Sequence, residues 1–239
     1  MDESAPKNWG QDKLSNFVET AQQNTFATFH NLKDVFKIFE DIDESFRRII
    51  DNIDNARDWF PAFFLLRAHS SYLGAVRLST SGQLPEAYMI LRGCLENSLY
   101  GFYLFKRPKS AEVWLNRHDD EVAKKKARNE FKIGPMLKLL SSNDSKLGTV
   151  ASDLYERTID YGGHPNAWAL LTNLTKKRDD ASIKFELNYL TGKSPALALC
   201  LKTNGQVGVC SLMVFKLVFK ERFDLLGISD KLQKLGRGL

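Results

Sequence analysis

The chain has 239 residues, of which 43% are hydrophobic and 26% charged, so it can bury a substantial core without disulfides or metals. The formal net charge of +5 is a modest excess that favours only loose contact with anionic surfaces, and three widely spaced cysteines in apolar segments favour reduced core thiols over a disulfide framework. No linker-like stretch divides the chain, and its start lacks the apolar run of a secretory signal. We therefore expect a cytoplasmic protein with a flexible tail over residues 1–13 and a single helical domain over residues 14–239.

Three helices are predicted in the first half of the chain. Apolar residues recur every three or four positions from Leu32 to Ile53, which is typical of an amphipathic helix. Pro61 suits the first turn of the next helix, which should end near Ser81. A third helix is expected over about 84–105. Because the connection between the last two is short, they should form an antiparallel hairpin.

The middle of the chain continues the helical pattern. Ser110 can cap a helix that runs on through a basic segment to Phe131. Further helical segments are expected at 136–140 and 146–161. Gly162-Gly163 should break the second of these.

The last third of the chain mixes helix and strand. Pro165 is placed to begin a helix that reaches Leu174, and alternating residues over 183–189 predict a strand with one buried face. Residues 196–201 are a candidate partner strand, although they could also begin the terminal helix, which is expected over about 206–226. The predicted fold class is mainly α, a multi-helix bundle with a small β-strand or hairpin near the C-terminal third.

Several polar residues have ordinary structural interpretations. His69 lies on an apolar stripe, so a hydrogen-bonded core residue is expected there. Arg92 and Glu96 are four positions apart on one helix, which favours a local ion pair. The basic cluster at 124–128 is interpreted as a solvated helix face. The sequence has no phosphate-binding glycine loop and no clustered metal ligands, so we expect no cofactor and no metal.

One segment carries a chemical signal. Residues 155–166 place Arg157 and His164 seven positions apart. Together with the helix containing Arg92-Gly-Cys-Leu-Glu96 and with Trp114-Leu-Asn-Arg117, this segment resembles a group of uncharacterised bacterial helical proteins and, more remotely, the HEPN superfamily of helical RNases and toxins.

The resemblance implies a metal-independent endoribonuclease of toxin or defence type. His164 would act as the general acid or base, and Arg157 would stabilise charge on the phosphate. The supporting residues would be Asp160, Asn166, Arg92 and Glu96. The implied partners are RNA and an antitoxin or other protein, the implied assembly is a homodimer, and no membrane is involved.

Two other hypotheses remain open. Thr158 follows the arginine where active members often carry Asn, Asp or His, and Pro165 pushes His164 away from helical dihedrals. The segment at 164–166 could therefore be a structural corner in a non-catalytic helical interaction module that binds a partner protein or a nucleotide. A third hypothesis is a small-molecule enzyme that uses Arg92, Glu96 and His164 in an internal pocket.

Overall fold

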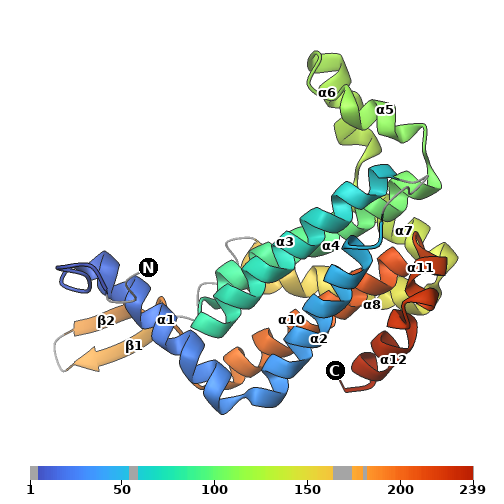
Figure 1. Cartoon of the computed structure of the whole chain (residues 1–239). Helices are drawn as coiled ribbons and strands as arrows, with labels where there is room; N and C mark the ends of the chain where they lie inside the picture. The colour runs from blue at the N-terminus through green and yellow to red at the C-terminus, as the bar shows by residue number, and fades with distance from the viewer. Residues whose placement is uncertain (1–4, 54–58, 164–173, 180–181, 239) are drawn as a thin grey trace.

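Two antiparallel helices, α3 (Trp59–Ser81) and α4 (Leu84–Lys106), form the centre of the fold (Figure 1). The structure is a computed structural model that describes residues 5–53, 59–163, 174–179 and 182–238. Gly74 on α3 lies against Ile90 on α4, whereas Gly101 near the other end of α4 lies against Phe64. Since the contacts pair late residues of one helix with early residues of the other, the predicted antiparallel hairpin is confirmed.

Helix α10 (Pro195–Lys216) crosses this hairpin and is the most deeply buried helix described. Ser194 caps it by accepting a hydrogen bond from the backbone N–H of Leu197 at 3.1 Å. Gly208 lets it approach two neighbouring helices, because a Cβ there would lie 2.7 Å from Tyr72 Cε2 and 2.8 Å from Ile42 Cγ2. By length and composition α10 could span a membrane, but 67% of its most apolar window is buried inside the protein, as in a core helix.

The remaining helices surround these three. Helix α2 (Lys33–Ile50) carries the predicted apolar stripe and packs it on α3 and α10. Helices α7 (Ile133–Asn143) and α8 (Ser145–Thr158) form a second tight pair on α4. The other helices are α1 (Lys13–Asn31), α5 (Ser110–Leu115), α6 (Glu121–Glu130), α11 (Lys220–Leu225) and α12 (Ile228–Gly238). The expected mainly α bundle is confirmed. The helix expected from Pro165 lies outside the described residues except at Leu174, where the expectation is wrong because Leu174 begins a β-strand.

A small β-hairpin lies at one end of the molecule (Figure 1), and the Tyr189 ring just after it packs edge-on against Phe17 of α1 with centroids 6.3 Å apart. Strand β1 (Leu174–Asp179) pairs antiparallel with β2 (Ser182–Leu187). The strand at 183–189 is therefore confirmed in its main part. Of the two alternatives for residues 196–201, the partner strand is wrong and the start of the terminal helix is confirmed, because these residues form the first turns of α10. The expected buried face is also wrong at Phe185, which is 62% exposed, because this two-stranded ribbon projects beyond the helical core.

Helices α5 and α6 form an arm that projects from the body (Figure 1). The single helix expected from Ser110 to Phe131 is interrupted at 116–120, where Asp120 starts α6 by accepting a hydrogen bond from Ala123 N–H at 2.7 Å. Ser110 does not cap α5; its hydroxyl donates to Glu130 Oε1 at 2.6 Å and ties the two helices together.

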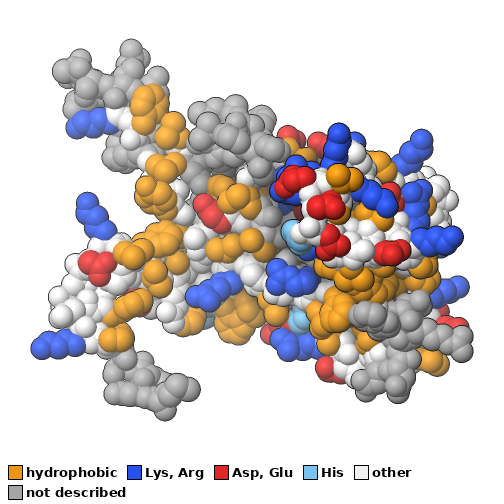
Figure 2. Space-filling model, turned by 90° about the horizontal axis from the view of Figure 1, so that it is seen from above, with side chains coloured by type: hydrophobic (Ala, Val, Ile, Leu, Met, Phe, Trp, Pro, Cys, Tyr) orange, Lys and Arg blue, Asp and Glu red, His pale blue; other side chains and the backbone are white. Residues whose placement is uncertain are grey.

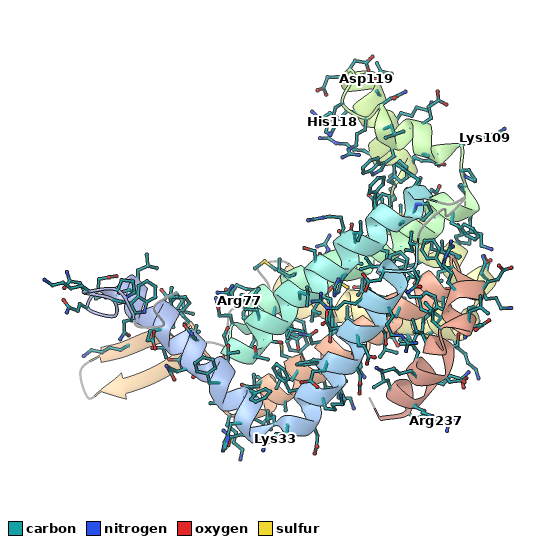
Figure 3. The ribbon with its side chains drawn as sticks, in the orientation of Figure 1. Lys33, Arg77, Lys109, His118, Asp119 and Arg237 are labelled. Atoms are coloured by element: carbon teal, nitrogen blue, oxygen red, sulfur yellow. The ribbon has the colours of Figure 1, made fainter. Side chains whose placement is uncertain are left out.

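The surface of the arm carries charges of both signs. Acidic and basic side chains are intermixed over it in the view from above (Figure 2), and His118 and Asp119 lie at its outer end (Figure 3). Arg117 stacks on the Trp114 ring at 3.8 Å from the centroid and donates to His118 Nε2 at 3.1 Å. This mixture agrees with the interpretation of the basic cluster as a solvated helix face.

His69 is a core histidine, as expected. It is 8% exposed, stacks on Phe46 with ring centroids 5.1 Å apart, and pairs through Nε2 with Asp43 Oδ1 at 2.6 Å. Burial alone would raise the pKa of Asp43, but hydrogen bonds from Arg47 and His69 outweigh it and hold that pKa below its usual 3.8. The pair links α2 to α3 and satisfies a buried ring nitrogen.

Candidate functional site

A groove of about 560 Å³ lies between α8 and α12, with α10 as its floor. Its walls and floor are largely apolar, and the apolar lining residues are Leu147, Val150, Leu154, Val209, Cys210, Met213 and Leu232. Polar side chains stand among them, and these are Asp144, Lys146, Asp153, Arg157, Gln206 and Gln233. A concave, mainly apolar surface of this volume with a few polar groups is the usual form of a ligand site.

Arg157 stands at the end of the groove formed by the last turn of α8. Its half-buried guanidinium donates through Nη1 to Gln206 Oε1 at 2.7 Å and to Thr203 Oγ1 at 3.2 Å. Both acceptors are neutral, and within the described part of the chain no carboxylate pairs with Arg157. The side chain is thus held in place by neutral groups, while Asp153, one turn earlier on α8, lines the same groove without an ion pair to it.

Tyr88 of α4 lies behind Arg157, and its phenol is buried. Burial raises the pKa of Tyr88 well above its usual 10, and the nearby Arg157 charge lowers it only in part. The Thr203 hydroxyl lies close to both groups. The buried Tyr88 hydroxyl itself accepts and donates no hydrogen bond among the described residues, so the bonded polar groups at this junction are Arg157, Thr203 and Gln206.

A π-helical turn at Ile159–Gly163 follows α8 directly. The sequence predicts a break at Gly162-Gly163, and the helix instead widens and continues for one turn. Gly162 is packed against α4, where a Cβ would lie 2.7 Å from Tyr88 Cβ, and the Tyr161 ring stacks on Tyr88 with centroids 5.2 Å apart. Turns of this type frequently occur at functional sites.

The structure brings only some of the predicted site residues to this groove. Arg157 lines it, whereas Asp160 is exposed on the π-helical turn and is not a lining residue. His164 and Asn166 lie outside the described residues. The pairing of Arg157 with His164 that the resemblance implies therefore stays a prediction.

Arg92 and Glu96 form a separate cluster on α4. Arg92 Nε donates to Glu96 Oε1 at 2.8 Å, which confirms the expected local ion pair. The Tyr155 hydroxyl from α8 donates to the same oxygen at 3.1 Å, and the Arg92 guanidinium lies over the Tyr155 ring at 5.4 Å. Burial and the Glu96 charge raise the pKa of Tyr155 to about 12. This cluster ties α4 to α8, and its residues do not line the groove.

Sequence reasoning missed the acceptors that hold Arg157. Thr203 and Gln206 interrupt the most apolar helix of the chain, and this polar break was the available signal. Cys210 lies on the floor, where burial raises its pKa to about 12, so its thiol stays protonated at neutral pH. What the groove offers chemically is an oriented cation beside apolar walls, a combination suited to binding an anion.

The chain was also compared with known proteins. Searches against family models, curated proteins and solved structures found no match.

Proposed function

We propose that the chain is a helical binding protein whose groove between α8, α10 and α12 takes up a ligand with an apolar body and a negative charge. The observation that carries this proposal is the Arg157 guanidinium, which is fixed by two neutral acceptors and has no carboxylate partner among the described residues. In a partly desolvated site, the electrostatic attraction between such a cation and a ligand anion is stronger than it would be in water.

The groove surface supports the same proposal. Val150 is 47% exposed, so apolar area is available for burial by a ligand. Each Å² of apolar area removed from water contributes about 25 cal/mol. Asp144 and Asp153 also line the groove, and their charges disfavour a ligand with several negative groups. The groove therefore suits a ligand with one anionic group and a larger apolar part.

A fluorescence titration with 1-anilinonaphthalene-8-sulfonate tests this proposal, because the dye combines apolar rings with one sulfonate. Arg157→Ala should weaken dye binding about tenfold, which corresponds to about 1.4 kcal/mol. Lys202→Ala is the matched control, because it removes an exposed cation from α10 outside the groove. Equal affinities for wild type and Arg157→Ala, with both proteins folded to the same degree, would remove Arg157 from the site.

A metal-independent endoribonuclease of toxin or defence type is the second candidate. It is favoured by the position of Arg157, which lies without a carboxylate partner in the described residues and one π-helical turn before the segment containing His164. Arg157 would contact the phosphate and His164 would transfer the proton, in a cleft completed by a second copy of the chain.

An RNA cleavage assay in the presence of EDTA tests the endoribonuclease proposal. If it is correct, the wild-type protein cleaves end-labelled RNA, and Arg157→Ala and His164→Ala each reduce the rate by about 100-fold or more. Intact RNA after incubation with folded wild-type protein, across substrates of varied sequence and structure, would rule it out.

A further inference from the structure

The groove is long as well as apolar. Its lining positions on α8 extend from Lys146 to Arg157, and at 1.5 Å per residue these eleven steps span about 17 Å. The apolar positions on this wall, Leu147, Val150 and Leu154, are three and four residues apart. The same spacing recurs on the floor, where Val209 and Met213 face the groove. The site is therefore a strip of apolar ridges with Arg157 at one end and with Asp144 and Lys146 at the other.

Such a strip matches the packing surface of another helix. Side chains three and four apart on one helix form ridges that fit the grooves of a neighbour. An extended peptide would instead lay its backbone N–H and C=O groups against helical walls that offer no strand edge, and those groups would lose their hydrogen bonds. A helical segment satisfies its own backbone groups, so it can be buried here without that cost.

We propose that the occupant of the groove is an amphipathic helix from a partner protein, with an Asp or Glu positioned against Arg157. The partner helix inserts apolar side chains at spacings of three and four between α8 and α12. Its single acidic side chain supplies the charge that Arg157 lacks among the described residues, while Asp144 and Asp153 disfavour additional acidic groups. This inference rests on the proposed binding function and names the class of its ligand.

A displayed library of helical peptides of about 14 residues, long enough to cover the groove, provides the test. Selection on the wild-type protein should enrich helices with apolar residues at i, i+3 or i+4, and i+7, and with one Asp or Glu next to that stripe. Arg157→Glu should weaken binding of a selected helix by at least tenfold. Changing the peptide's acidic residue to Lys should restore most of that loss.

Two further variants test whether the partner helix binds in the groove. Val150→Asp places a carboxylate on the wall of the groove and should also weaken binding at least tenfold, because an unpaired charge would be buried in the interface. Lys202→Glu makes the same charge reversal as Arg157→Glu, but on the exposed face of α10, and should change the affinity less than twofold.

The outcomes separate this inference from the proposed function. Selected helices without an acidic residue, or with affinities that neither Arg157→Glu nor Val150→Asp changes, would overturn the helix assignment. If the naphthalene sulfonate dye binds in an Arg157-dependent way and no helix is enriched, the groove is a small-molecule site and only the helix assignment fails. If neither probe depends on Arg157, both proposals fail.

Discussion

Phe215→Ala is expected to lower the free energy of unfolding by about 3–5 kcal/mol, the usual cost of removing a buried phenylalanine ring. Phe215 lies on α10 with no exposed surface, and its ring packs so closely on Gly101 of α4 that a Cβ there would lie 2.8 Å from Phe215 Cε1. The surrounding helices are held by many other contacts, so they cannot collapse fully into the space left by the ring.

Urea denaturation of both proteins measures this difference. Phe185→Ala is the control, because it removes the same ring from a side chain that is 62% exposed on β2, and it should cost less than about 0.5 kcal/mol. Similar losses in the two variants would mean that Phe215 is not packed in the buried core.

Gly208→Ala is expected to destabilise the protein by about 1–3 kcal/mol, although alanine is normally the better helix residue by about 1 kcal/mol. The added methyl group would lie 2.7 Å from the Tyr72 ring and 2.8 Å from the Ile42 side chain, which belong to two different helices. The clash therefore forces α10 away from α3 or α2.

Gly134→Ala supplies a control of opposite sign. Gly134 lies in the first turn of α7, and a Cβ there would meet no atom within 4 Å. This substitution should leave stability unchanged or raise it by up to about 1 kcal/mol. Thermal unfolding followed by circular dichroism compares the two, and a stabilising Gly208→Ala would contradict the close packing of α10.

The regular helices could be predicted from the sequence because their apolar stripes are strong local signals. The stripe from Leu32 to Ile53 and the turn near Gly82 define α2 and the α3–α4 hairpin without reference to distant residues. The strand partner was missed because residues 196–201 are apolar in a way that suits either a strand or a buried helix. These residues are helical because they are buried among other helices, and this tertiary packing cannot be read from the local sequence.

The candidate site was only partly predictable. Arg157 stands out through its spacing from His164, but the groove depends on where α12 and α10 lie relative to α8, and no local pattern specifies that arrangement. Thr203 and Gln206 gain their role only when α10 passes beside the end of α8. Tyr155 likewise meets Glu96 across 59 positions of sequence, which spacing rules for a single helix do not cover.

Methyl NMR of the methionines shows whether a ligand binds in the Arg157 groove or elsewhere on the protein. The chain has four methionines. Met213 lines the groove, Met136 is fully buried in α7, and Met89 is 47% exposed on α4 outside the groove. The three methyl groups therefore report on the site, the core and an unrelated apolar surface.

Addition of 1-anilinonaphthalene-8-sulfonate should shift the Met213 methyl signal and leave those of Met89 and Met136 unchanged. At a dye concentration equal to the wild-type Kd, the Met213 shift should be about fivefold smaller in Arg157→Ala, because its binding is about tenfold weaker. A shift at Met89 with an unchanged Met213 signal would place the ligand on the exposed surface of α4 and contradict the assignment of the groove as the binding site.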